Sequence, residues 1–444
     1  MAHRAGPERA VTLAWRGEDS HPLLAALGLS TGRFATANLN VHAGDEMLIH
    51  YGNIHPGDPG RALALYFDSG RRIWETMWTL LRWRFGEPGP DFRMLDFASG
   101  YGRMTRFAVL NLPPERIRVS DISREGVRFQ EEQFGVRGIV SHAAPERFDP
   151  GETFDAILVS SLFTHLPEDS FRAWLRRLRD LLRPGGMLVF SVHGEEIVPP
   201  GREIPPEGVL FDPKSEIDAL PGEQYGTTWV SEAFVRRALP EGSAHRIRRG
   251  LLLFQDLWVI VPEPGCDFSG LTLRLEPESF VEHCSAGGGR LRISGWVMDR
   301  VRRSPPVEVR LILGDARHVL RDLPPRDEVA ALFPYERVDA RGWRFDVPLS
   351  EGDLTVEAVG ASGEVWRLYA DTVAGALLRS ARLDLHDTLR RAEETEARRL
   401  RETTELERVI HVLEARIAGM EASRFWKMRE VWFRIKKRLG RGKG

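Results

Sequence analysis

The sequence contains little cysteine and no long apolar run. Only two cysteines, Cys266 and Cys284, occur among its 444 residues, which is too few for a disulfide framework and suits a reducing compartment. Residues 1–10 lack the apolar core of a secretory signal, and the apolar run at 250–255 is much shorter than a membrane-spanning helix. These absences predict a cytoplasmic protein.

A strong charge of either sign is also missing. The formal net charge is -2 at pH 7, so the bulk composition gives no indication of a nucleic-acid partner. We likewise expect no bound metal. A hydrophobic content of 42% and a charged content of 28% are typical of soluble globular domains, and the length of the chain predicts two or three of them.

Residues 61–262 alternate between short apolar runs and amphipathic stretches. Residues 1–60 are rich in Gly, His and Pro and are expected to be an irregular segment of loops and short helices. The apolar runs predict strands, and the amphipathic stretches predict helices. This alternation predicts an α/β fold with a doubly wound, Rossmann-like sheet of seven strands. The expected strands are residues 93–98, 116–121, 138–141, 154–160, 187–192, 245–252 and 256–261. The expected helices are residues 62–81, 123–134, 168–182 and 230–239, with one more that ends at 112.

A linker at 262–265, rich in Pro, precedes a region of different composition. Residues 268–373 contain short alternating strands separated by turn residues, without a long helical pattern, which predicts a small β-sandwich. The expected strands are residues 271–275, 291–298, 307–314, 343–348, 354–359 and 365–369.

Residues 377–444 are expected to form a charged helical tail. Positions from Thr403 to Met420 step by 3 and 4 residues, as the seam of a coiled coil requires, so we expect a homo-oligomer formed through 403–420. Residues 424–443 contain nine Lys or Arg and one acid, with aromatic residues between them, which predicts a basic amphipathic helix. Two interpretations stay open: contact with anionic lipid at the inner face of the membrane, or a coiled-coil extension with a solvated basic end.

The clearest chemical motif lies between the first expected strand of the sheet and the following helix, from Asp96 to Gly102. A glycine turn at this point lets the backbone approach a ligand closely, and the helix N-terminus adds free N–H groups. Asp121 follows nineteen residues after Gly102, at the end of the next strand, where a carboxylate can accept the hydroxyl hydrogens of a ribose. A dinucleotide is disfavoured, because the third glycine of its fingerprint is missing and Asp96 would repel a pyrophosphate.

Residues 95–103 resemble the first motif of class I S-adenosylmethionine-dependent methyltransferases. Residues 158–167 and 182–190 resemble the fourth-strand and fifth-strand segments of the same superfamily, and residues 255–260 fit its closing antiparallel hairpin. The resemblance covers about residues 90–262. It implies S-adenosylmethionine as the cofactor, which carries an ammonium group that suits Asp96 and has no phosphate.

The resemblance also implies site residues. Asp96 and the backbone of Ser99, Gly100 and Gly102 would face the methionine end of the cofactor, beside Ala98, which stands where the family usually has its first glycine. Asp121 would hold the ribose and Ile122 would flank the adenine. The residues that would border the methyl group and the acceptor are Ser160, Ser161 and Leu162.

Methyl transfer is an in-line displacement, so the enzyme mainly aligns the acceptor with the methyl group. An oxygen acceptor must also lose a proton, for which histidine is the usual base. His165 follows the fourth expected strand and His193 the fifth, and both are candidate catalytic residues. The alternative is that either histidine only packs or lies in a loop.

Taken together, these patterns predict a methyltransferase that acts on a small-molecule or glycan acceptor, such as a sugar hydroxyl of a surface glycan or its precursor. The glycan is suggested by residues 293–299 and 420–429, which resemble elements that accompany bacterial enzymes of surface-polysaccharide assembly. A first alternative is an inactive scaffold that recruits partners through the sandwich and the coiled coil, with Ala98 as its support. A nicotinamide-dependent oxidoreductase is disfavoured by Asp96 and the missing glycine.

Overall fold

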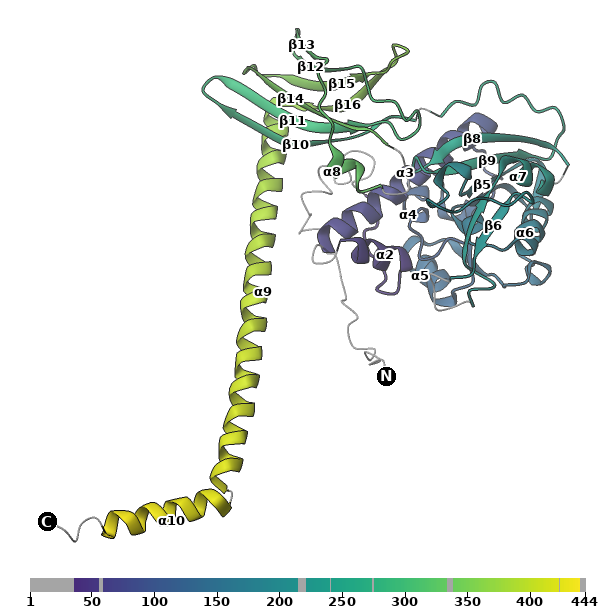
Figure 1. The fold of residues 1–444 in the computed structure, drawn as a ribbon. Coiled ribbons are helices and arrows are strands. Elements are labelled where there is room, and N and C mark those ends of the chain that lie inside the picture. Colours follow the sequence, from purple (N-terminus) through teal and green to yellow (C-terminus); the bar gives the residue numbers. More distant parts are fainter. Residues whose placement is uncertain are drawn as a thin grey trace. The chain divides into compact units, whose positions relative to one another are not determined.

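The computed structural model describes residues 36–55, 59–214, 221–239, 241–273, 275–333, 338–422 and 424–439 (Figure 1). The chain forms two compact units, Met1–Leu383 and Asp384–Gly444. The first unit contains an α/β sheet followed by small antiparallel sheets, and the described residues of the second unit are helical. Among the helices of the described ranges, none combines the length and the apolar character that crossing a bilayer requires.

The α/β part is built on the seven-stranded sheet that the sequence predicts. Its strand order is β3-β2-β1-β4-β5-β9-β8. The first five of these strands are parallel to one another, whereas β9 runs antiparallel to both of its neighbours, so the sheet is mixed. The strands are β1 (Met94–Phe97), β2 (Ile117–Asp121), β3 (Arg137–Val140), β4 (Phe154–Val159), β5 (Leu182–Val192), β8 (Ser243–Leu251) and β9 (Gln255–Val261).

Helices cover both faces of this sheet, because alternate strand residues point to opposite sides. Met94 and Leu158 belong to the core beneath α3, whereas Leu95 and Ile157 belong to the core beneath α6 and α7. The two apolar cores explain why the central strands are apolar along their whole length. The helices are α2 (Glu46–Ile54), α3 (Pro59–Phe85), α4 (Thr105–Ala108), α5 (Arg124–Phe134), α6 (Glu168–Asp180) and α7 (Glu232–Ala238).

Several expected boundaries were wrong. The helix after the glycine turn ends at Ala108 rather than at 112, and turns lead from there to the Pro113–Pro114 pair. The fifth strand begins at Leu182 rather than at 187, so the Pro-Gly-Gly segment that ends α6 also belongs to the strand. By contrast, the short helix α2 at residues 46–54 agrees with the loops and short helices expected before residue 60. The Asp45 side chain caps this helix by accepting two backbone N–H groups. A small two-stranded sheet that was not expected, β6 (Val209–Asp212) with β7 (Thr227–Val230), follows β5.

Two small antiparallel sheets follow the α/β part. One has the order β10-β11-β14 and the other β13-β12-β15-β16, and buried side chains of both sheets form a single core, as in a β-sandwich. The strands are β10 (Glu278–Gly287), β11 (Arg290–Met298), β12 (Glu308–Leu313), β13 (Ala316–Leu320), β14 (Ala340–Pro348), β15 (Asp353–Val359) and β16 (Val365–Thr372), with the short helix α8 (Asp327–Ala330) before β14.

The first strand expected in this region was wrong. Residues 271–273 are not in a strand, and Leu271 is buried in the core beneath α3, so this segment packs against the α/β part. The sheet begins instead at β10, which alternation did not reveal because its register shifts between Val281 and His283. The hairpin strand β13 was also missed, since most of its side chains are at least partly exposed.

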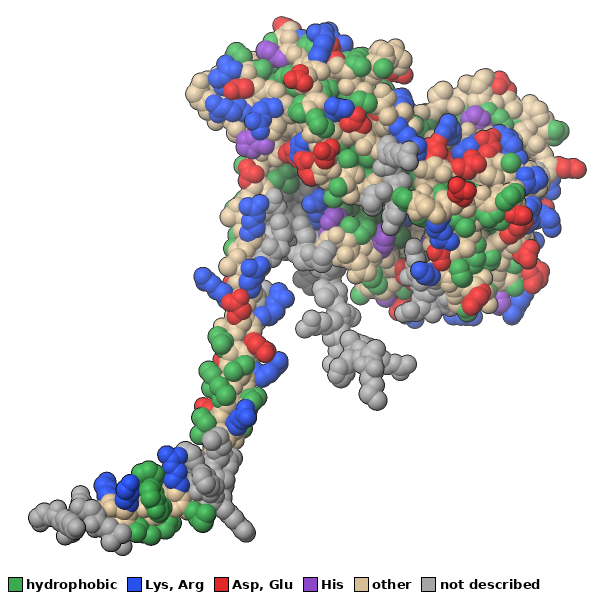
Figure 2. Space-filling model, viewed as in Figure 1, with side chains coloured by type: hydrophobic (Ala, Val, Ile, Leu, Met, Phe, Trp, Pro, Cys, Tyr) green, Lys and Arg blue, Asp and Glu red, His purple; other side chains and the backbone are tan. Residues whose placement is uncertain are grey.

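The C-terminal part is helical, as expected. Helix α9 (Val373–Ala422) has 50 residues, and α10 (Arg424–Leu439) has 16. The first turns of α9 belong to the first unit, where Ala376 is buried in the sandwich core and the Ser380 hydroxyl accepts a hydrogen bond from the Cys284 N–H. In the second unit, hydrophobic side chains lie exposed between Lys and Arg along the helices (Figure 2).

Candidate active site

The glycine turn after β1 has the backbone geometry that its sequence requires. Ala98, Gly100 and Gly102 all have positive φ, of 58°, 56° and 79°. A Cβ on Gly102 would lie 2.6 Å from the Phe134 ring, so helix α5 packs directly on the turn. Ala98 adopts the left-handed conformation in spite of its side chain, which explains why the family usually has glycine at this point.

Asp121 ends β2 and lies against this turn. Its Oδ2 accepts a hydrogen bond from the Gly100 N–H at 2.8 Å, and its Oδ1 accepts one from the Ser123 N–H at 2.9 Å. Burial raises the pKa of Asp121, and these N–H donors act against the rise. The carboxylate therefore holds the turn, and an ionised carboxylate has further lone pairs for a ligand. Ile122 follows directly and is half-buried.

Asp96 lies on the neighbouring strand β1 and is buried. Burial raises its pKa to about 7, against a hydrogen bond from the Thr105 hydroxyl, which lies 2.8 Å from Asp96 Oδ2. The charge of Asp121 raises the same pKa further, so the two carboxyl groups lie within electrostatic reach of each other. A cationic ligand between them would favour the ionised form of both.

Gln130 of α5 joins the two carboxyl groups into one polar network. Its Nε2 donates to Ser99 Oγ and to Gly100 O, both at 2.9 Å, and its Oε1 lies 2.9 Å from the Thr105 hydroxyl that binds Asp96. The structure thus brings the predicted acids and the glycine turn together on one side of the sheet. Sequence reasoning missed Gln130, because only its complete burial sets it apart from the polar residues around it on α5.

The segment before α3 packs against this network and was also missed. The Asp45 carboxylate accepts a hydrogen bond from the Tyr66 hydroxyl at 2.6 Å. Arg106, fully buried after the glycine turn, donates to the backbone carbonyls of Asn38 and Asn40 at 3.0 and 2.8 Å. Because this buried arginine donates to backbone carbonyls of the N-terminal segment, it holds that segment beside the glycine turn.

This segment adds further acidic character. Burial raises the pKa of Glu46, and the charges of Asp45 and Asp121 raise it further. His42 stacks on Tyr101 of the glycine turn with ring centroids 4.7 Å apart, and the Tyr101 hydroxyl donates to Glu125 at 3.2 Å. The side chains around the turn therefore have a negative bias, which suits a cation and opposes a phosphate.

The second half of the candidate site follows β4. Ser161 has a φ of 65°; its N–H donates to Ser191 Oγ at 2.8 Å and its hydroxyl donates to Gln255 Oε1 at 3.1 Å. The Ser160 hydroxyl is buried and has no hydrogen-bond partner among the described residues. Leu162 begins a short 3-10 turn. Because β1, β2, β4 and β5 are parallel, these residues lie at the same edge of the sheet as Asp96 and Asp121.

His165 ends that turn and is held in one orientation. Its Nδ1 lies 2.7 Å from the Gly226 carbonyl oxygen, and since a carbonyl can only accept, Nδ1 carries the proton. In the neutral ring Nε2 then has the lone pair. The imidazole stacks on Tyr225 with ring centroids 4.6 Å apart.

His193 follows β5, and its side chain is largely shielded from solvent. Burial lowers its pKa to about 3, the charge of His165 lowers it further, and a hydrogen bond with the Thr228 backbone acts in the opposite direction. Its Nδ1 is buried without a hydrogen-bond partner among the described residues. The rings of Trp229 and Phe254 lie nearby, each with its centroid 6.1 Å from that of His193. His193 is therefore neutral at physiological pH and electrostatically coupled to His165.

Residues 95–188, which carry both halves of this edge, match the family described as a methyltransferase domain. The chain contains a class I S-adenosylmethionine-dependent methyltransferase domain. The methyltransferase domain is similar in structure to DhpI in complex with SAH, with 17% identity over 51% of this chain and 98% of that chain and a TM-score of 0.33. The PH0226 protein from Pyrococcus horikoshii is 19% identical over 44% of this chain and 91% of that chain, with a TM-score of 0.31. The sugar N-methyltransferase KedS8 from Streptoalloteichus is 14% identical over 68% of this chain and 71% of that chain, with a TM-score of 0.24. No curated protein matches the chain in sequence.

Proposed function

We propose that this protein transfers the methyl group of S-adenosylmethionine to a hydroxyl of a neutral small-molecule or glycan acceptor. The observation that carries the proposal is the network in which Asp96 and Asp121 are joined through the glycine turn and Gln130. It supplies two carboxyl groups and backbone N–H groups, with further acids beside them. This donor and acceptor set fits a cofactor with an ammonium group, a positive sulfur and ribose hydroxyls.

Each residue of the cofactor half has an assigned role in this proposal. Asp121 accepts the ribose hydroxyl hydrogens, and Ile122 flanks the adenine. Asp96, through its own carboxylate and the turn from Ala98 to Gly102, faces the methionine end. When bound, S-adenosylmethionine supplies a methyl group that is already activated by its positive sulfur, so the protein contributes alignment rather than activation.

On the acceptor half, His165 is the proposed base. The Gly226 carbonyl fixes the Nδ1–H tautomer, so Nε2 would accept the proton of the acceptor hydroxyl. The bound cofactor would supply the methyl group to that oxygen, its sulfur–methyl bond would break, and S-adenosylhomocysteine would leave. His193, whose pKa of about 3 makes it a weak base, remains neutral and orients the acceptor by hydrogen bonding at Nδ1. Ser160, Ser161 and Leu162 border the methyl group.

A neutral acceptor is supported by the side chains at this half. Ser160 and Ser161, the neutral His193, Tyr225 and Trp229 bring no charge to complement an ionic acceptor. Hydroxyl and imidazole groups suit a sugar hydroxyl. The resemblance of residues 293–299 and 420–429 to elements of surface-polysaccharide enzymes favours a glycan or its precursor over other alcohols.

The inactive scaffold is no longer the favoured alternative. Its support was alanine in place of the first glycine, but Ala98 adopts the required positive φ and the turn forms around it.

Titration calorimetry of the full-length protein with S-adenosylmethionine tests the cofactor half. The wild type is expected to bind, and Asp121→Ala to bind at least ~100-fold more weakly. The variant loses the ribose acceptor together with two charge-assisted hydrogen bonds, one from the Gly100 N–H of the turn and one from the Ser123 N–H. Asp315→Ala, in an exposed hairpin of the sandwich, serves as the matched control. Absence of binding by the wild type would remove the proposal.

Transfer of labelled methyl groups to a bacterial surface-glycan fraction tests the acceptor half. His165→Gln should lower the rate by about 100-fold or more, as expected for loss of a general base, with an unchanged affinity for S-adenosylmethionine. Equal rates for wild type and variant would instead assign His165 to packing.

We further propose that the helices of the second unit set the oligomeric state and bring the enzyme to a membrane surface. Leu406, Ile410, Leu413 and Ile417 are between 51% and 63% exposed along one seam of α9, an apolar stripe that a second copy would cover. On α10, Met428, Trp432 and Ile435 are at least half exposed, and Arg429 and Lys436 lie beside them. That arrangement suits an interfacial helix on anionic lipid.

Deletion of the residues after Glu421 separates these two roles. We expect binding to vesicles of anionic phospholipid to be lost, while sedimentation still gives an oligomer and the affinity for S-adenosylmethionine stays the same. Loss of the oligomer with retained vesicle binding would show that α10 extends the coiled coil instead.

A further inference from the structure

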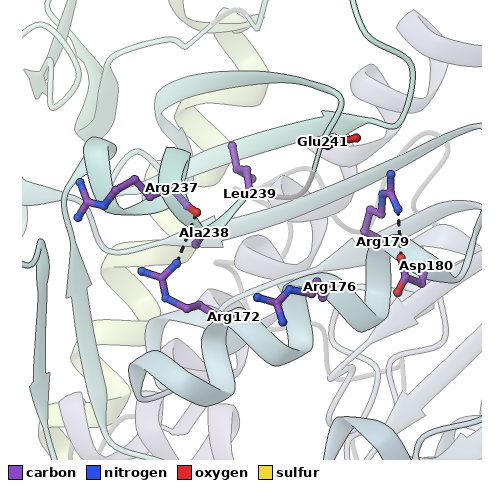
Figure 3. Close-up of a pocket in the computed structure, with 8 residues that line it drawn as sticks. All are labelled: Arg172, Arg176, Arg179, Asp180, Arg237, Ala238, Leu239 and Glu241. Carbon is purple, nitrogen blue, oxygen red and sulfur yellow. Dashed lines mark hydrogen bonds and ion pairs between the residues drawn. The ribbon is translucent and has the colours of Figure 1, made fainter.

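One pocket of the methyltransferase domain has no part in the proposed transfer. It has a volume of about 310 Å³ and lies between α6 and the end of α7. Figure 3 shows Arg172, Arg176 and Arg179 along α6, across from Ala238 and Leu239. Arg237, Asp180 and Glu241 complete the lining. The pocket is at the low end of the volumes at which small ligands bind.

The position of the pocket separates it from the candidate active site. Helix α6 begins just after the turn that follows β4 and returns along the sheet to the start of β5. The arginines follow each other at positions i, i+4 and i+7 on one side of this helix, and the other side, with Phe171 and Leu175, is buried in the core. The pocket therefore lies on the outer side of α6, away from the glycine turn, which contacts α5 on the other face.

The charges of the pocket are not balanced within the protein. Arg172 forms an ion pair with Glu168 at 2.9 Å, and Arg179 forms one with Asp180 at 3.2 Å. Arg176 makes no ion pair or hydrogen bond within the described part of the chain, and Arg179 Nε is buried without a hydrogen-bond partner there. The Arg237 guanidinium points away from the pocket and donates to the Glu207 carbonyl oxygen at 2.7 Å. Arg176 and the Arg179 Nε therefore remain as the donors for an anion in this pocket.

Helix energetics do not account for this arrangement. Arginines spaced by three and four residues repel each other, at a cost of a few tenths of a kcal/mol for each pair. The negative end of the helix dipole offsets that cost only in the last turn, which holds Arg179 but not Arg172. A bound anion would offset it for all three.

We infer that this pocket is an anion site that binds the phosphate group of a phosphorylated small molecule. Planar guanidinium groups match phosphate oxygens in a bidentate way. The three terminal oxygens of a phosphate ester can accept from more donors than the two oxygens of a carboxylate can. The apolar surface of Ala238 and Leu239 lies beside the carbon part of the ligand. The site is independent of the cofactor, since none of its residues belongs to the network around Asp96.

Calorimetry of the full-length protein with inorganic pyrophosphate, at constant ionic strength set with chloride, tests this site. The wild type should bind pyrophosphate, and the double variant Arg176→Gln/Arg179→Gln at least ten-fold more weakly. Arg176→Lys should be intermediate, because it keeps the charge but not the bidentate geometry. All variants should keep the melting temperature and the affinity for S-adenosylmethionine.

The matched control is Arg128→Gln, on the exposed side of α5, which should leave pyrophosphate binding unchanged. Equal pyrophosphate binding in wild type and double variant, or no binding by the wild type, overturns the inference. Vesicles that contain phosphatidic acid distinguish the source of the phosphate: weaker vesicle binding by the double variant assigns a lipid headgroup, and unchanged vesicle binding assigns a soluble phosphate ester.

Discussion

The two halves of the sheet edge differ in how burial shifts the pKa values of their titratable side chains. On the β1–β2 half, buried carboxyl groups lie so close that burial and mutual repulsion raise the pKa of Asp96 to about 7. On the β4–β5 half, burial and a second imidazole lower the pKa of His193 to about 3. The acidic β1–β2 half would thus be stabilised by a cationic ligand, whereas His193 in the β4–β5 half, here called the neutral half, stays uncharged. A methyl donor with positive charge and a neutral acceptor would meet at the boundary between them.

The largest expected effect comes from the glycine turn of the acidic half. In Gly102→Ala the new Cβ would lie 2.6 Å from the Phe134 ring and 2.8 Å from Gln130 Oε1, at a φ of 79°. We expect the free energy of unfolding to fall by about 4 kcal/mol, from steric overlap and from backbone strain together. Urea unfolding measures it. Gly100→Ala, whose Cβ would meet no atom within 4 Å, should lose only about 1 kcal/mol, and equal losses in both variants would contradict this geometry.

Asp96→Asn should change how stability depends on pH. The folded-state pKa of about 7 lies above the ordinary aspartate pKa of 3.8, so the native state binds more protons than the unfolded state between these values. The wild type must then lose stability as pH rises through 7. Asparagine removes this loss. We therefore expect the free energy of unfolding of the variant, relative to that of the wild type, to be about 3 kcal/mol higher at pH 8 than at pH 5. Urea titrations at both pH values measure the difference; a pH-independent difference would show that Asp96 is ionised throughout.

His193→Gln should act in the reverse direction. The folded-state pKa of about 3 lies below the ordinary histidine pKa of 6.5, so the unfolded state binds more protons than the native state between these values. The wild type therefore loses stability as pH falls below 6.5. The free energy of unfolding of the variant, relative to that of the wild type, should be about 2 kcal/mol higher at pH 5 than at pH 8. The same urea titrations measure this difference. His318→Gln, in the partly exposed strand β13, is the control and should show no such trend.

The sequence predicted the acidic half better than the neutral half, for a physical reason. Asp96, the glycine turn and Asp121 follow from two strand ends and a backbone that must turn sharply, and these constraints are local. Strands β1, β4 and β9 are apolar enough to be found by composition alone, whereas β8 is rich in Arg. Register, by contrast, depends on partners, which is why the Pro-Gly-Gly segment was assigned to a helix stop and not to β5.

The missed residues act across long sequence separations. Gln130 is polar on a helix and only its burial against the turn gives it a role, and Arg106 resembles a surface charge until the carbonyls of residues 38 and 40 are seen to enclose it. The orientation of His165 depends on the Gly226 carbonyl, 61 residues further along the chain. No local pattern encodes such contacts. The sequence could therefore name the histidines but not separate their proposed roles.

A smaller change in stability is expected at Ala98, the residue that stands where the family usually has glycine. Ala98→Gly should raise the free energy of unfolding by about 1 kcal/mol, because a φ of 58° is strained for alanine and free for glycine. The added flexibility of glycine in the unfolded chain offsets part of this gain. Ala108→Gly, in α4 with ordinary helical geometry, should instead lose about 1 kcal/mol. If both variants lose stability in urea unfolding, the turn is relaxed around Ala98, and the departure from glycine has a compensation elsewhere in the acidic half.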